Sequence, residues 1–443
     1  MSEGADGISN PASRRPAVRP GLAVLLGLHI VVCCLSLIQV ARFYPKPQIV
    51  LFDTVHLSAA VANVVLFATV SVLFILARFS FGYFLGFYFY TMILGYIWLV
   101  EFSKLHYDHT TAAISAVASA IAFLVPALFI TSPVRQRFVP SARTFDRLLS
   151  LILILAAVTV AVGSLYNFRL VGLGEIYDFR AEIAFPAWLR YSIGATSSAL
   201  LPFAFACFAM HGNRWRAAAA LLLLLSLYPL TLTKLTLFAP FWLLFLAALS
   251  SLLKPRTAVL LSLLLPMLAG VLLTVPVAAG AFAYDRIMNV FGAINFRMVA
   301  YPSVALDVYN DFFSRHEYTH FCQIQLLKPF MSCPYNEYLS VVMAKAYDLG
   351  NLNASLFATE GVASVGPILA PLAALACGLV ISLGNRLSAG LPARFILLSA
   401  GLFPQVLLNV PLATTLLTNG AALLFLLWYV TPRAMFEKAA DKA

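Results

Sequence analysis

The segment RHEYTHF at residues 315–321 has the spacing of a zinc-binding motif, with His316 and His320 flanking Glu317. On a helix, a His-Glu-x-x-His sequence presents both imidazoles on one face, where they can hold zinc beside a glutamate that acts as general base. Glu337 would be the third ligand of such a site. The preceding YNDFFSR is a weak helix pattern, which disfavours this zinc peptidase alternative. The same side chains can instead be solvated loop residues, or His316 and Glu317 can act as a metal-free acid and base.

Arginines recur in the polar segments of the chain, and they indicate a different chemistry. A single arginine in such a place is most simply an ion pair or an interfacial anchor. As a set, however, guanidinium groups match phosphate oxygens, so the arginines together suit a lipid-linked diphosphate. The candidate cations are Arg169, Arg180, Arg190, Arg286, Arg297, Arg315 and Lys234. Acids lie between them and can supply a general base: Glu175, Asp178, Glu182, Asp307, Asp311, Glu317 and Glu360.

The elements that must position these residues are apolar helices. The 443 residues are 62% hydrophobic and 11% charged, whereas soluble domains are about 25% charged. Twelve apolar stretches have spanning length or nearly so, and the sequence therefore predicts an all-α, polytopic membrane bundle. The stretches are 21–42, 57–77, 80–100, 111–131, 148–165, 191–210, 217–233, 235–253, 257–278, 361–383, 394–410 and 412–430. Residues 1–20 and 431–443 are expected to be cytoplasmic tails, the first of them disordered, around one membrane domain at 21–430.

The basic residues sort by side of the membrane. With both termini on one side, that side holds 17 of the 29 Lys and Arg but five of the 18 Asp and Glu. The positive-inside rule makes it cytoplasmic. The net charge of +11 is thus a feature of topology, and no nucleic-acid partner is expected.

The other side, expected to be periplasmic, carries two long loops at about 166–190 and 279–360. Within the second loop, apolar spacing predicts a helix over 283–299, with Arg286 and Arg297 on one face because eleven residues make about three turns. A second helix is expected over 336–348, with Asn336 as N-cap and Gly350 as C-cap.

Two further features of this side follow from the sequence. Cys322 and Cys333 lie where a disulfide can persist, and we expect them to pair. Lys234 interrupts two apolar runs, and a lysine at mid-bilayer costs about 3 kcal/mol or more. The less costly arrangement is a hairpin of two short helices with Lys234 at its outer tip.

The order of these features resembles the bacterial O-antigen and oligosaccharide repeat-unit polymerases, which are related to the O-antigen ligases. The resemblance covers roughly residues 150–430 and rests on YDFRAEI at 177–183, LTLTKLTLF at 230–238 and GNLNASLFATEGVASVG at 350–366. It implies a metal-independent membrane glycosyltransferase without a cofactor. By position, Arg180 matches the arginine before a span, and Arg297 or Arg315 matches that of the long loop. Some members repeat an arginine-to-glycine spacing that this sequence does not show.

We therefore expect an enzyme of the bacterial inner membrane that polymerises undecaprenyl-diphosphate-linked oligosaccharides at the periplasmic face. Arg180 and Arg297 would be catalytic, with Glu182, Glu317 or His316 as the base. The expected substrate contacts are Arg169, Lys234, Arg286, Arg315, Asn353 and Glu360. A chain-length regulator and a flippase are the partners that the resemblance implies. The alternatives are an O-antigen ligase, a transporter of polysaccharide or lipid-linked sugar, and the zinc peptidase.

Overall fold

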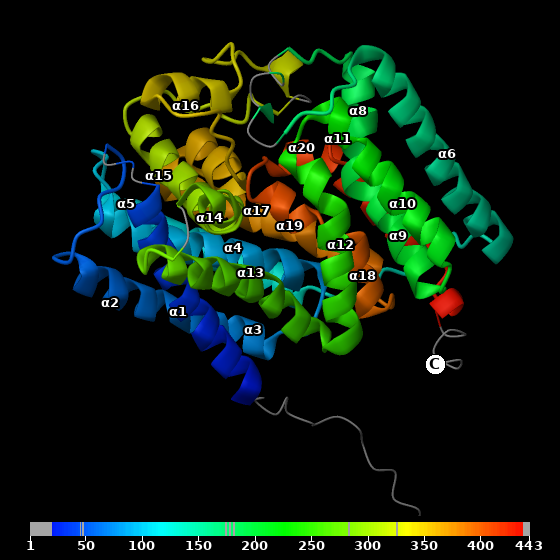
Figure 1. Cartoon of the computed structure of the whole chain (residues 1–443), viewed down its shortest axis with the longest axis horizontal. Coiled ribbons are helices and arrows are strands. Elements are labelled where there is room, and N and C mark those ends of the chain that lie inside the picture. The colour runs from blue at the N-terminus through cyan, green and yellow to red at the C-terminus, as the bar shows by residue number, and fades with distance from the viewer. Residues whose placement is uncertain are drawn as a thin grey trace, which may run out of the picture.

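The computed structural model describes residues 20–44, 46, 48–172, 175–176, 179, 182–281, 284–324 and 327–436 (Figure 1). In this part of the chain every named element is a helix, and the only β-type pairings are isolated bridges. Nine helices there are long and apolar enough to cross a membrane. The predicted all-α membrane bundle is therefore confirmed, whereas the count of twelve spans is not.

The nine long helices follow the predicted apolar stretches closely. Four of them contain a short 3-10 or π segment, so each carries more than one label. They are α1 (Pro20–Phe43), α2–η1–α3 (Leu57–Leu76), α4 with η2 (Phe81–Phe102), α5 (His109–Phe129), α6 (Ala142–Tyr166), α8–η3–α9 (Ala187–Met210), α12 (Lys234–Leu252), α13 (Pro255–Ala278) and η6–α17 (Phe357–Ser388).

The other three stretches are broken into shorter helices. Residues 217–233 contribute to α10 (Arg214–Ser226) and α11 (Tyr228–Thr231). The last two stretches form α18 (Ala393–Ser399), α19 (Phe403–Leu407), α20 (Leu412–Leu417) and α21 (Ala421–Val430). Pro411 and Gly420 flank α20, and Gly420 has φ +76, which ends a helix. Hydropathy predicts that these residues are buried in the bundle or in lipid, but it does not show where the helix breaks.

The core of the bundle is α4, in which every residue is buried. Small residues let its neighbours approach closely, as is usual between membrane helices. A side chain at Gly82 of α4 would meet the backbone oxygen of Ala127 on α5 at 2.0 Å. Likewise, a side chain at Gly378 of α17 would meet the backbone oxygen of Phe123 at 2.5 Å. These contacts hold α4, α5 and α17 together beneath the polar loops.

The loops that carry most of the lysines and arginines lie at one end of the bundle, which we call the basic end. There, Arg386 donates to the carbonyl oxygen of Ser132 (3.3 Å), and Arg433 donates to that of Leu387 (2.8 Å). Residues 431–436, expected to be part of a tail, pack at this end, and Phe436 is buried. In Figure 1 the start of α1 lies at the bottom, and α16 with the loops next to it lies at the top.

Much of the long loop at 279–360 packs into the bundle as helix. α14 (Tyr284–Phe291), the π-helix η4 (Gly292–Ala300) and α15 (Tyr301–Phe313) follow one another without a break. The helix predicted over 283–299 is therefore present, and it continues through YNDFF, where a helix was not predicted. The second predicted helix is α16 (Leu339–Tyr347), but its caps are Tyr338 and Asp348 rather than Asn336 and Gly350.

Candidate functional site at the polar face

The loop after α6 packs onto the hairpin between α11 and α12. The backbone N–H of Arg169 donates to the carbonyl oxygen of Pro229 (3.0 Å), and the Tyr228 hydroxyl donates to that of Val171 (2.7 Å). Leu232 turns the chain in a left-handed conformation, and Thr233 then caps α12, whose first residue is Lys234. Lys234 thus lies at the hairpin tip, as predicted. The second helix is not short, however, because α12 has 19 residues and is long enough to cross a membrane.

Two of the predicted site residues meet in this loop. Arg169 forms an ion pair of 2.7 Å with Glu182, and its guanidinium lies 5.2 Å from the ring centre of Phe179. Both partners are substantially exposed, so water weakens the pair. An anionic group such as phosphate can compete with Glu182 for this arginine. Arg180, the arginine on which the sequence analysis relied most, lies outside the described residues.

A second group is built around a buried carboxylate, Asp311 of α15. Its oxygens accept hydrogen bonds from the backbone N–H of His106 (3.0 Å) and the hydroxyl of Tyr347 (2.5 Å). Arg315, one turn later, is half-exposed and forms an ion pair with the same carboxylate. Arg315 is therefore held at the surface by a buried anchor. The sequence identified Asp311 only as one of seven acids, and nothing in it indicated that Tyr347 would join.

Asp307, one turn earlier on α15, is fully buried. It accepts hydrogen bonds from the hydroxyls of Ser103 (2.8 Å) and Tyr107, both in the loop between α4 and α5. Burial raises the pKa of Asp307 to about 7, and the nearby charge of Asp311 adds to the shift. The pKa of the Tyr107 hydroxyl is also raised, chiefly by burial. Together these bonds fasten the 103–109 loop to α15.

The HEYTH segment does not form a helix, so the geometry of a helical zinc site is absent. α15 ends at Phe313, and His320 and the following residue adopt left-handed backbone conformations. The ring of His316 stacks on Phe312 at 3.9 Å, and Glu337 is paired with Lys345 at 2.7 Å. Among the described residues, no three His, Cys, Asp or Glu side chains gather as metal ligands.

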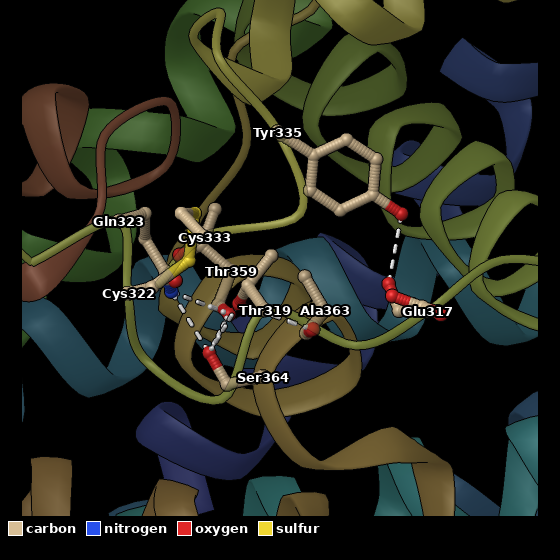
Figure 2. The surroundings of a disulfide bond; sticks show 9 residues. All are labelled: Glu317, Thr319, Cys322, Gln323, Cys333, Tyr335, Thr359, Ala363 and Ser364. Atoms are coloured by element: carbon tan, nitrogen blue, oxygen red, sulfur yellow. Dashed lines mark hydrogen bonds between the residues drawn. A yellow bond between two sulfur atoms is a disulfide. The ribbon is translucent and has the colours of Figure 1, made fainter. Parts of the chain in front are cut away.

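This segment is instead fixed by the expected disulfide. Cys322 and Cys333 are bonded, with their Cα atoms 5.4 Å apart (Figure 2). Beside the bond, the Gln323 amide donates to the hydroxyl of Ser364 (2.8 Å), and the Thr319 N–H donates to the carbonyl oxygen of Ala363 (2.8 Å). The loop is thereby docked onto the start of η6–α17.

A hollow of about 570 Å³ opens beside the disulfide on the polar face. That volume is in the range of ligand sites, which are about 300–1,000 Å³. Its lining consists of Glu317, Tyr318, His320, Ser332, Cys333 and Pro334. Two of these residues, Glu317 and His320, were singled out from the sequence, whereas the contributions of Tyr318 and Ser332 were missed because their separation along the chain gives no pattern.

The remaining predicted site residues have varied surroundings. The guanidinium of Arg297 lies 4.4 Å from the ring centre of Tyr301, and Asn353 is exposed in the segment before η6. Arg286 is on α14, but its side chain lies outside the described part. Glu360 is buried in η6, where it accepts hydrogen bonds from the backbone N–H of Ala413 (3.0 Å) and from its neighbour Thr359. Glu360 therefore holds the start of α20 and has little exposure to a substrate.

Comparisons with models of known protein families, with curated proteins and with solved structures found no match. The functional assignment consequently depends on the chemistry of the residues.

Proposed function

We propose that this chain is an integral membrane glycosyltransferase that polymerises undecaprenyl-diphosphate-linked oligosaccharide units at the periplasmic face of the bacterial inner membrane. The observation that carries the proposal is the pairing of cations with carboxylates on two separate polar segments. Arg169 pairs with Glu182 beside the hairpin of Lys234, and Arg315 pairs with Asp311 at the end of α15. Such groups at the end of a membrane bundle suit a substrate with a lipid tail and a diphosphate.

The reaction assigns a role to each kind of group. A hydroxyl oxygen of one lipid-linked unit attacks the anomeric carbon of the growing glycan, and the bond from that carbon to the diphosphate oxygen breaks. The leaving diphosphate gains negative charge, which prepositioned arginines stabilise most at that moment. The acceptor hydroxyl gives its proton to a base, for which Glu182, Glu317 and His316 are the candidates.

The test is glycan chain length in a strain that carries Arg180→Ala. Loss of long-chain glycan, with the protein still in the membrane, is expected. The matched control is Arg143→Ala, which removes an exposed arginine at the basic end. Long-chain glycan of normal amount in the Arg180→Ala strain would refute the assignment. An O-antigen ligase would be indicated instead if lipid-linked polymer accumulates when the whole gene is deleted.

A carrier for lipid-linked sugar is the second candidate, and the broken helices α18 to α21 favour it. Breaks at membrane depth are tolerated where they are buried in protein or line a cavity, and in transporters they mark binding sites. Asn419 beside the α20–α21 break lies 3.5 Å from the hydroxyl of Ser198 in the π-helix η3. Transfer of labelled lipid-linked sugar across vesicles without new glycosidic bonds would establish this candidate.

A further inference from the structure

We propose that the hollow beside the disulfide, which we call the Glu317 hollow, binds a neutral saccharide through its hydroxyl groups. It would hold the sugar of the acceptor unit, away from the diphosphate. The role of that sugar as an acceptor rests on the proposed function. The binding of a saccharide in the hollow does not depend on that function.

The chemistry of the lining matches sugar hydroxyls. The residues that line the hollow include Glu317, His320, Tyr318 and Ser332, whose side chains carry a carboxylate, an imidazole, a phenol and a hydroxyl. A carboxylate accepts two or more hydroxyl hydrogen bonds, and the other three groups can both donate and accept. An aromatic ring also offers a flat apolar face to the C–H groups of a sugar.

The charge of the lining excludes the other obvious ligand of a transferase, a phosphate. Within the described residues the lining contains a carboxylate and no lysine or arginine. A phosphate in the hollow would be repelled by Glu317, since like charges a few ångströms apart are unfavourable. Two of the cations of the polar face are paired with other carboxylates, Arg315 with Asp311 and Arg169 with Glu182.

Several restraints hold the lining in place before any ligand arrives. The backbone N–H of His320 donates to the carbonyl oxygen of Ser364 (3.2 Å), and the Tyr335 hydroxyl donates to that of Glu317 (2.8 Å; Figure 2). Tyr318 packs against Gly366, where a side chain would come within 2.7 Å of its ring. A preorganised site loses less entropy when it binds.

The backbone itself carries strain at this place. His320 and Phe321 have φ of +46° and +67°, a left-handed backbone conformation that non-glycine residues rarely adopt. Two consecutive residues of this kind persist only where the surroundings enforce them. Here the disulfide and the bonds to Ala363 and Ser364 do so, and His320 is one of the residues that line the hollow.

The experiment uses the full-length protein in lipid nanodiscs and saturation-transfer NMR. The probes are the methyl glycosides of glucose, galactose, mannose and N-acetylglucosamine, with inorganic pyrophosphate as the anionic probe in a phosphorus-detected titration. At least one glycoside is expected to show saturation transfer. Ser332→Trp, which fills the hollow, should abolish it, and Glu317→Gln should weaken binding about tenfold, as for loss of a charged hydrogen bond.

The matched control is Glu337→Gln, which neutralises an exposed carboxylate outside the lining and should leave binding unchanged. An intact Cys322–Cys333 bond, measured by peptide mapping without reduction, verifies that each variant is folded around the hollow. The inference is overturned if Ser332→Trp leaves every glycoside signal in place. It is also overturned if Ser332→Trp abolishes the binding of pyrophosphate instead of the binding of a glycoside.

The two proposals fail separately. Glycoside binding that Ser332→Trp removes, in a protein that makes no polymer with any lipid-linked substrate, would support the hollow and refute the transferase. Polymer formation that depends on Arg180 but is unchanged by Ser332→Trp would support the transferase and refute the hollow as its acceptor site.

Discussion

At the scale of single residues, the carboxyl group of Asp307 makes the stability of the folded protein depend on pH. Its carboxyl is buried against Ser103 and Tyr107, and its pKa in the folded protein is about 7, compared with an ordinary value of 3.8. Between these two values the folded protein keeps a proton that the unfolded chain releases. The stability of the protein is therefore highest at the acidic end of this window and falls as the pH rises towards 7.

We expect Asp307→Asn to flatten this dependence, because an amide cannot ionise, and its one oxygen can still accept a hydrogen bond from one of the two hydroxyls. The measurement is the thermal unfolding midpoint in detergent from pH 5 to pH 8. The control Asp53→Asn removes an exposed carboxylate whose pKa is lowered by hydrogen bonds from His56, and it should leave the fall in place. If the unfolding midpoint of the Asp307→Asn protein falls with rising pH as much as that of the wild-type protein, this account is contradicted.

Gly366 is the residue that lets the disulfide loop dock. Its φ of +75° and ψ of 169° are accessible almost only to glycine, and a side chain there would collide with Tyr318. We expect Gly366→Ala to destabilise the protein by on the order of 2 kcal/mol, seen as a lower unfolding midpoint. Gly350→Ala is the matched control, since that glycine has open space around it. Equal midpoints for the two variants would show that the docking is not required.

At the scale of elements, Glu360 joins η6 to α20. We expect Glu360→Gln to keep the unfolding midpoint, because the amide oxygen can still accept from the N–H of Ala413, whereas Glu360→Ala should lose about 1–3 kcal/mol. The sequence alone predicts that Glu360 contacts substrate. If Glu360→Gln stops polymer formation at normal stability, that earlier expectation is the better one.

Several of the structural elements could be predicted from the sequence. Nine long apolar helices, the hairpin tip at Lys234 and the disulfide followed from hydropathy, the cost of a buried charge and the cysteine positions. The helix breaks around α20 were missed because hydropathy alone does not register the helix-breaking residues Pro411 and Gly420.

The candidate site was harder to predict than the helices. Some of its residues come from segments far apart in the chain, such as Tyr107 with Asp307, and no local pattern joins them. The HEYTH motif is the opposite case, a local pattern that does not correspond to a site. Its spacing brings the two histidines together only on a helix, and α15 ends before the motif begins.

At the scale of the whole molecule, the two ends of the bundle should face opposite sides of the membrane. Phe168→Cys places a thiol in the loop after α6, and Phe138→Cys places one in the loop before it; both positions are exposed. With intact cells, we expect a membrane-impermeant maleimide to label the first variant and to label the second only after permeabilisation. The native cysteines outside the disulfide are buried or half-buried, so wild-type protein serves as the background. Labelling of both variants in intact cells would invalidate the topology.

The proposed function requires that cationic groups of the polar face stabilise the lipid diphosphate as the glycan leaves it. The most direct measurement incubates the purified protein in vesicles with undecaprenyl-diphosphate-linked oligosaccharide from the organism that encodes it, and resolves the products by size. We expect a ladder of glycans that increases by whole repeat units, persists in EDTA and is lost in Arg180→Ala. Unchanged substrate, or a ladder that Arg180→Ala forms equally well, would contradict the account.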